Sequence, residues 1–286
     1  MRQLRAYECH TQPRAHSVRL TRVFIDGALT AGGVVELTRD AGAHLVKVLR
    51  ARSGDELVLF NGDGREYSGV IEAVRGSRVS ASIGAARSSD RESPFKLTLV
   101  QCVPRGDRMD FIVQKATELG VARIVPVLSQ RSVVRLDAGQ AASKQAHWHA
   151  VAVSACEQCG RNRLPAVEAP QPLLSYLGAL QPADPSGEFL RLVLEPERAG
   201  RASPASQPID IADSAAAGAQ IAIGPEGGFA PEELEAFALS SFATVGLGPR
   251  ILRTETAAIA ALVVLQARYG DMSDRSYEAS RAADAC

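Results

Sequence analysis

Twice near its carboxyl end, the chain passes from a short apolar run through a glycine-proline loop into a helix start. In the first unit, Gln220–Ile223 leads through Gly224-Pro-Glu-Gly-Gly-Phe229 into Pro231-Glu-Glu233, where proline and acids suit a first helical turn. Open α/β proteins bind ligands where strands end and helices begin. The repeated pattern therefore predicts two loops that form two walls of one ligand pocket.

The second unit begins with the apolar run Ala243–Leu247 and turns at Gly248-Pro249. Glycine tolerates positive φ and proline presets its own φ, which favours a tight turn. Thr254 stands where a helix N-cap is expected, and Glu255 follows in the first turn. Neither loop matches a dinucleotide fingerprint or a phosphate P-loop. The alternative to a ligand pocket is a pair of purely structural turns.

The residues of these loops resemble a known family. Ile223–Phe229 and Leu247–Ala257 are similar to signatures of the 16S ribosomal RNA uridine N3-methyltransferase family of the SPOUT superfamily. Arg108–Gly120 and Glu157–Arg161 resemble it as well, in the same order, and the likeness covers about residues 20–271. The resemblance implies an α/β fold class, a SPOUT-type trefoil-knotted α/β domain preceded by a small β-rich PUA-like barrel domain. It also implies a homodimer that uses S-adenosyl-L-methionine.

The sequence pattern changes along the chain. Short β-type runs separated by glycine turns come first, with one helix expected over Asp40–Arg50, where Leu45, Val48 and Leu49 share a face. After the polar stretch Arg87–Pro94, strands alternate with helices. A short strand is expected over Leu190–Leu194, and the rest of 182–217 around it reads largely as an inserted surface loop. We expect a flexible N-terminal extension (1–20), a PUA-like RNA-binding domain (21–88), a SPOUT methyltransferase domain (95–271) and a polar tail (272–286).

Composition restricts location and partners. The formal net charge is zero, so no large overall field attracts nucleic acid. The apolar stretch Ala257–Leu265 is far shorter than the ~20 residues of a membrane helix, so no membrane partner is expected. The odd, scattered cysteines fit a reducing cytoplasm, the expected location. Cys156 and Cys159 form a C-x-x-C pair, for which helix packing is favoured over a zinc or redox role.

The resemblance places the cofactor between the two loops. Glycine permits close backbone approach, and the apolar side chains nearby suit a cleft around adenine. No metal site is expected. The expected cofactor-binding residues are Leu194, Ile223, Gly224, Pro225, Glu226, Gly227, Gly228, Leu247, Gly248, Ile251, Leu252, Arg253 and Thr254.

The implied reaction removes the N3 proton of uridine as the methyl group arrives. His147 and His149 lie well before the loops, which disfavours a histidine base. Arg253 remains protonated and is expected to stabilise negative charge on the uracil oxygens. Glu255 is the candidate proton acceptor; the alternative is that it only complements the helix dipole.

The expected substrate is 16S ribosomal RNA within the assembled small subunit. Candidate RNA-binding residues are Arg22, His44, Lys47, Arg50 and Arg52, although a merely solvated polar face is equally compatible with the pattern. Two rival functions remain, a ribose 2′-hydroxyl methyltransferase of the same superfamily and a non-catalytic RNA-binding assembly factor. Dimer contacts and RNA contacts are both open for Gln114, Lys115, Glu118, Glu157 and Arg161.

Overall fold

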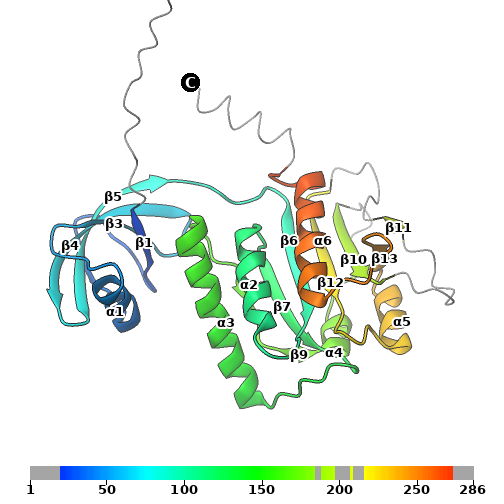
Figure 1. The fold of residues 1–286 in the computed structure, drawn as a ribbon. Coiled ribbons are helices and arrows are strands. Elements are labelled where there is room, and N and C mark those ends of the chain that lie inside the picture. Colours follow the sequence, from blue (N-terminus) through cyan, green and yellow to red (C-terminus); the bar gives the residue numbers. More distant parts are fainter. Residues whose placement is uncertain (1–19, 184–187, 197–206, 209–215, 273–286) are drawn as a thin grey trace, which may run out of the picture.

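The computed structural model describes residues 20–183, 188–196, 207–208 and 216–272 (Figure 1). Most of the predicted N-terminal extension, most of the predicted inserted loop and the tail from 273 onward lie outside the described residues. So do Cys9 and Cys286.

The first sheet forms from the amino-terminal part of the chain. Its elements are β1 (Thr21–Phe24), β2 (Val34–Glu36), α1 (Arg39–Lys47), β3 (Glu56–Phe60), β4 (Arg65–Arg75) and β5 (Arg78–Ser88). The strand order is β1-β3-β4-β5-β2, with β1 parallel to β3 and the other neighbours antiparallel. Leu57, Leu59 and Val79 are almost fully buried in a small core of their own. Apolar side chains at alternate strand positions, such as Leu57 and Leu59, supply this core.

Helix α1 is shorter than expected. Thr38 caps it, because its Oγ1 accepts a hydrogen bond of 3.3 Å from the Ala41 N–H. The helix ends at Lys47, so Val48 and Leu49 do not share the buried face of Leu45 as predicted; both are exposed. The chain leaves α1 in a turn in which Arg50 has a φ of 54°.

The second sheet has parallel strands in the order β11-β13-β10-β12-β6-β7-β8, and β9 also pairs with β7. Its strands are β6 (Lys96–Cys102), β7 (Arg123–Leu128), β8 (Ala166–Val167), β9 (Gln171–Pro172), β10 (Phe189–Leu194), β11 (Gln207–Pro208), β12 (Gly218–Ile223) and β13 (Ala243–Gly246). The helices are α2 (Arg108–Glu118), α3 (Ala138–Cys159), α4 (Leu173–Gly178), α5 (Pro231–Leu239) and α6 (Thr254–Tyr269). The sequence did not predict α4, β8, β9 or β11.

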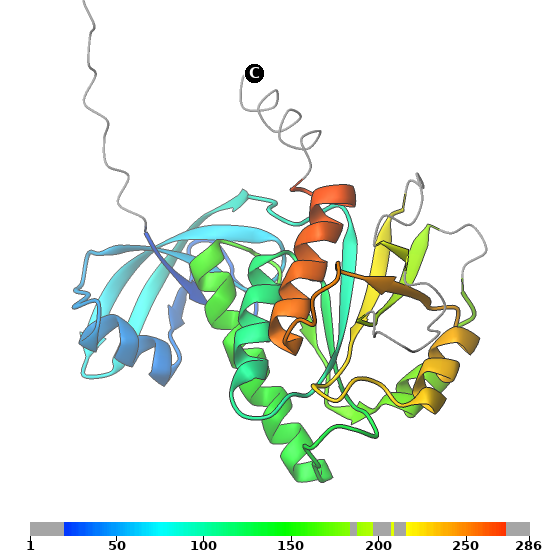
Figure 2. The ribbon, with the colours of Figure 1, turned by 45° about the vertical axis from the view of Figure 1, so that its right-hand side comes forward.

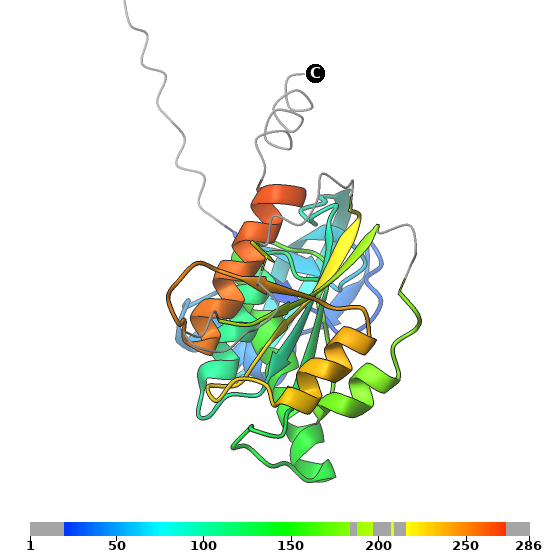
Figure 3. The same ribbon diagram turned by 90° about the vertical axis from the view of Figure 1, so that its right-hand side faces the viewer.

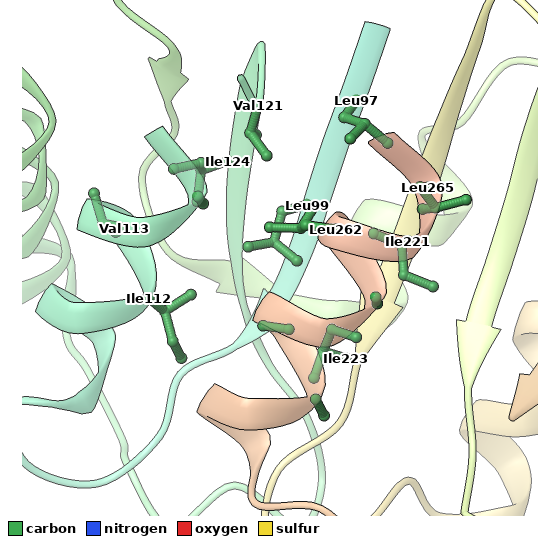
Figure 4. Packing of buried hydrophobic residues seen from close by; sticks show 14 of the residues in the cluster. Leu97, Leu99, Ile112, Val113, Val121, Ile124, Ile221, Ile223, Leu262 and Leu265 are labelled. Carbon is green, nitrogen blue, oxygen red and sulfur yellow. The ribbon is translucent and has the colours of Figure 1, made fainter. Parts of the chain in front are cut away.

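Helices cover both faces of the second sheet (Figures 2 and 3). Successive strand residues point to opposite faces, so Leu97 and Leu99 pack with α2, α3 and α6, while Val100 and Cys102 pack with α4 and α5. Figure 4 shows the first of these cores, where Leu262 of α6 lies among side chains of β6 and β12. Each fully buried Leu or Ile contributes about 1.5–3 kcal/mol of transfer free energy.

The carboxyl-terminal part of the chain crosses its own sheet. Strand β13 lies between β11 and β10, whereas α6 packs on α2, β6 and β12. Residues 247–253 make this crossing at the carboxyl ends of the strands. The out-of-order path is consistent with the expected trefoil knot, although the loop between β10 and β12 lies partly outside the described residues.

The described residues contain neither a helix suited to a membrane nor a cluster suited to a metal ion. None of their helices combines the length and apolarity needed to span a bilayer. No cluster of three or more His, Cys, Asp or Glu side chains among them is arranged to hold a metal ion.

Candidate active site

A cavity of about 250 Å³ lies at the carboxyl ends of β10 and β12 and beside the first turn of α6. All the predicted cofactor-binding residues line it except Gly227. The sequence reasoning missed four lining residues, Glu195, Pro196, Arg250 and Ala257. All four lie within three positions of a predicted cofactor-binding residue, so closeness in sequence to the two loops and to the end of β10 was the signal that could have found them.

Positive φ angles shape the two loops. Gly228 has a φ of 70°, and its N–H donates to the Pro225 carbonyl at 2.8 Å, closing a tight turn after β12. Gly248, after β13, has a φ of 73°. Any other L-residue there would cost about 1–2 kcal/mol. At Gly224 the restriction is steric, since a Cβ would lie 3.2 Å from the Phe229 ring.

Thr254 ties the two loops together. Its hydroxyl donates to the Gly224 carbonyl at 2.9 Å and accepts from Gln101 Nε2 at 2.9 Å. The expectation that Thr254 is the N-cap was wrong, because Arg253 occupies that position without a side-chain cap. The Thr254 hydroxyl is instead used to fix the relative position of the loops. The first-turn N–H groups of α6, uncapped by any side chain, lie at the cavity wall and favour a negatively charged ligand group.

The charged side chains of the loops differ in their surroundings. Glu226 forms an ion pair of 2.5 Å with Arg108, and both side chains are about 40% exposed. Arg253 lines the cavity and is exposed. Glu255 does not line it, and Glu255 Oε2 is buried without a hydrogen-bond partner among the described residues. His147 lies away from the cavity, with Nε2 2.7 Å from an Asp110 oxygen.

Arg22 lies between the two sheets, contrary to its expected RNA-contacting position. Its guanidinium donates to Glu66 Oε2 at 3.0 Å, to the Arg161 carbonyl at 3.1 Å and to Asn162 Oδ1 at 2.5 Å. It also lies over the Phe60 ring, 4.7 Å from its centroid. Because these contacts bury the side chain, Arg22 is poorly placed to reach a phosphate from outside the protein.

The carboxylate of Glu66 is compensated by two arginines. Burial alone would raise the pKa of Glu66, but hydrogen bonds and charge from Arg87 and Arg22 together lower it below the ordinary value. A buried carboxylate with two cationic partners can remain ionised. Glu66 and its two arginine partners, Arg22 and Arg87, therefore hold β1, β4 and β5 together close to the second domain.

The block Glu157–Arg161 also serves this junction. Arg161 Nη1 donates to the carbonyls of Thr117 (2.9 Å) and Val121 (3.0 Å), and its Nε donates to Glu92 at 3.1 Å. Glu157 Oε1 accepts the Phe24 N–H at 3.0 Å. Through these contacts α3 is bonded to β1, and the segment after α3 is bonded to the connector between the sheets.

The remaining residues with open roles stay on the surface of α2. Lys115 and Glu118 pair with each other at 2.8 Å, and Gln114 is exposed.

Cys156 is buried, and its hydrogen bond to Cys159 raises the Cys156 pKa and lowers that of Cys159. The pair packs at the end of α3 without further metal ligands among the described residues.

The other predicted RNA-binding residues gather around α1 and its end. His44 and Lys47 lie on α1, and Arg50 and Arg52 follow it; all four are exposed. Their position leaves them accessible to a polyanion, and their RNA contacts remain a prediction.

Comparison with known proteins gives concordant results. A family model described as an RNA methyltransferase domain matches residues 91–266, and one described as an RNA methyltransferase PUA domain matches residues 37–83. The protein called ribosomal RNA small subunit methyltransferase E in Bacillus subtilis is 33% identical over 247 residues, 86% of this chain and 93% of that protein.

Solved structures agree in fold. The Neisseria gonorrhoeae ribosomal RNA small subunit methyltransferase E, bound to S-adenosyl methionine, is 34% identical with a TM-score of 0.76 and covers 89% of this chain and 100% of its own. A Legionella pneumophila protein in complex with the same cofactor is 39% identical, has a TM-score of 0.77 and has the same coverage. These likenesses confirm the predicted fold class, a SPOUT-type α/β domain preceded by a small PUA-like domain. The chain therefore belongs to the family of RNA methyltransferases that includes ribosomal RNA small subunit methyltransferase E.

Proposed function

We propose that this protein transfers the methyl group of S-adenosyl-L-methionine to N3 of a uridine in 16S ribosomal RNA. The observation that carries the proposal is the cavity formed by the two glycine-proline loops and α6. Relatives of this family include a structure with S-adenosyl methionine bound. Two of the four stretches that resemble the family, Ile223–Phe229 and Leu247–Ala257, supply most of the residues that line this cavity.

The cavity has the features that this cofactor requires. Leu194, Ile223, Leu247 and Leu252 give it apolar walls, and the glycine turns expose backbone groups. The uncapped start of α6 favours the cofactor's carboxylate. When bound, the cofactor supplies an electrophilic methyl group on a sulfonium. The protein has to align the uridine and accept one proton.

Arg253 and Glu255 are the proposed catalytic residues. Arg253 lines the cavity, is exposed to the entering base and stabilises negative charge on the uracil oxygens. Glu226 is already paired with Arg108, whereas Glu255 Oε2 has no partner among the described residues. Glu255 is the proposed proton acceptor; because it does not line the cavity and its Oε2 is buried, this role requires the side chain to turn toward the bound uridine.

The proposed division of labour follows the two sheets. Residues 21–88 form the RNA-binding domain, in which His44, Lys47, Arg50 and Arg52 contact phosphates, and residues 95–271 form the methyltransferase domain. Sequence-specific recognition of RNA uses unpaired bases, so the uridine enters the cavity splayed out. The substrate is the RNA of the assembled small subunit, in the cytoplasm.

We also propose that the chain acts as a homodimer. Phe111 of α2 and Val263 and Val264 of α6 are exposed apolar side chains on adjacent helices. Exposed apolar side chains on neighbouring helices suit a protein interface. Sedimentation should give twice the chain mass of 30.3 kDa.

One substitution and one product analysis test the function. Arg253→Ala should lower turnover by ~10²–10³ with little change in cofactor affinity, because it removes one electrostatic partner of the developing anion. Arg135→Ala, which removes an exposed arginine outside the cavity, is the matched control. Turnover is measured with radiolabelled cofactor on small subunits from a strain that lacks the gene.

The product identifies which function is correct. Mass spectrometry of the digested RNA should find 3-methyluridine. A ribose-methylated nucleoside would instead support the 2′-hydroxyl enzyme. Absence of cofactor binding by calorimetry would support a non-catalytic assembly factor.

A further inference from the structure

The C-x-x-C motif lies in the last turn of α3, and the proposed methyl transfer does not use it. Cys156 and Cys159 are three residues apart, so their side chains share one face of the helix. Cys156 is buried, whereas Cys159 is partly exposed and is the thiol that solvent reaches. Gly160 follows with a φ of 91° and ends the helix. The two thiols therefore lie at a helix end, where the backbone can adjust more easily than in a helix centre.

The two thiols are close enough to react with each other. A hydrogen bond joins their side chains, and Cys156 Sγ also lies 3.7 Å from the Arg163 carbonyl oxygen, to which it donates. The helical rise and turn place the Cα atoms of residues three apart at about 5 Å. Disulfides need a Cα separation of about 4.4–6.8 Å. A bond between the two sulfurs therefore requires only an adjustment of the last helical turn.

The surroundings of Cys159 favour its thiolate, which is the reactive form of cysteine. Its pKa is lowered first by the hydrogen bond from Cys156 and then by the N–H and the charge of Arg161. Burial and the charge of Glu118 oppose this shift. Arg22 of β1 is a further cation close to Cys159. The same hydrogen bond, together with burial, raises the pKa of Cys156, so that thiol stays protonated.

A third cysteine among the described residues lacks these features. Cys102 lies in β6 and is fully buried, and burial raises its pKa. Core packing accounts for Cys102 and for the buried Cys156. It does not account for a partly exposed thiol at Cys159, hydrogen-bonded to a second thiol.

We propose that Cys156 and Cys159 are a thiol–disulfide site that reacts with hydroperoxides. The sulfur of Cys159 attacks the peroxide: an S–O bond forms, the O–O bond breaks, and one water leaves with the Cys159 proton. The sulfur of Cys156 then displaces the oxygen of this sulfenic acid, which leaves with the Cys156 proton as a second water. Two thiols are oxidised to one disulfide, and one hydrogen peroxide is reduced to two waters. This chemistry goes beyond methyl transfer and does not depend on it.

The disulfide is expected to be readily reversed. Cβ atoms three residues apart on a helix are about 5–6 Å apart, whereas a relaxed disulfide needs about 3.5–4.5 Å. Closing the bond therefore distorts the last turn of α3, and strained disulfides are the ones that cellular thiols reduce easily. That turn also carries Glu157, which accepts the Phe24 N–H of β1 at 3.0 Å. Oxidation would therefore act on a contact between the two domains.

The full chain with Cys9→Ser and Cys286→Ser, which lacks the thiols near its two ends, tests the proposal. Stoichiometric hydrogen peroxide should lower its intact mass by about 2 Da, the two thiol hydrogens. Peptide mapping should place the bond between Cys156 and Cys159, and dithiothreitol should restore the original mass. Cys102 should stay reduced and resist alkylation, which shows that the protein is folded throughout. An unchanged mass, or a disulfide that includes Cys102, would overturn the proposal.

Single variants in the same background separate the two roles. Cys156→Ser should leave Cys159 as a sulfenic acid, with a mass gain of about 16 Da. Cys159→Ser should react at least about tenfold more slowly, because burial shields Cys156 from peroxide. Equal rates for Cys159→Ser and its parent would mean that Cys159 is not the attacking thiol, and the proposal would fail. Serine is close to cysteine in size, and circular dichroism checks that each variant keeps the parent fold.

Discussion

The cofactor cavity and the domain junction are held by different kinds of interaction. The cavity is formed largely by backbone turns and apolar side chains, and the ion pair of its lining residue Glu226 with Arg108 is about 40% exposed. The junction is held by Arg22–Glu66 and Arg161–Glu92, whose side chains are at most 11% exposed. Backbone groups and apolar walls can bind and release a ligand at little cost. Buried charges cannot lose a partner without a large penalty, so the junction holds a fixed geometry.

This difference predicts unequal sensitivity to the loss of an arginine. Arg161→Met removes the partner of Glu92 and the donor to two buried carbonyls, and should destabilise the fold by about 3–5 kcal/mol. Arg108→Met removes the exposed pair and should cost at most about 1 kcal/mol. Urea unfolding followed by circular dichroism measures both. Equal losses of unfolding free energy in the two variants would mean that the buried and the exposed ion pairs stabilise the fold to the same extent.

Alanine substitutions at two glycines with left-handed backbone can distinguish the effect of backbone strain from an effect on cofactor binding. Gly248 (φ 73°) lines the cavity and Gly54 (φ 93°) lies in the first domain; a Cβ at either would meet nothing within 4 Å. Alanine should therefore cost each about 1–2 kcal/mol of stability through strain alone. Only Gly248→Ala should also weaken S-adenosylmethionine binding, about tenfold by calorimetry. If Gly54→Ala weakened it equally, global destabilisation would be the cause.

The cavity could be predicted because its determinants are local in sequence. Within about a dozen residues, each loop combines an apolar run, a glycine and proline, and the start of a helix. This local pattern predicted the loops, and Gly224 and Gly248 do lie at the strand ends. The error over Thr254 concerned one side chain. Its hydroxyl bonds Gly224 and Gln101, partners that lie 30 and 153 positions away, and no local pattern specifies them.

The junction could not be predicted for the same reason. Arg22 was expected to contact RNA, but its guanidinium is buried against Glu66, Arg161 and Asn162. Its partners, Asn162 and Glu66, are 140 and 44 positions away, so only the folded topology brings them together. Likewise, Val48 and Leu49 followed the helical period, but α1 ends before them. Sequence periodicity predicts a face and cannot fix the residue at which a helix stops.

The smallest expected effect is a difference in pH-dependent stability between the two junction carboxylates, Glu157 and Glu66. Burial raises the pKa of Glu157, so its ionisation opposes folding: the penalty is absent below about pH 4 and grows as pH rises through the folded pKa. Glu157→Gln should therefore raise Tm by about 2 °C at pH 8, with no gain at pH 4.

The pKa of Glu66 is lowered in the folded protein, so ionised Glu66 stabilises the fold above its unfolded pKa, and this stabilisation is lost as pH falls. Glu66→Gln should accordingly lower Tm at pH 8 and change it least in acid. Thermal unfolding at both pH values measures the contrast, and a loss of stability in Glu157→Gln at pH 8 would mean that this carboxylate is as well compensated as Glu66. A gain would mean that burial of this carboxylate costs more stability than its hydrogen bond with the Phe24 N–H contributes.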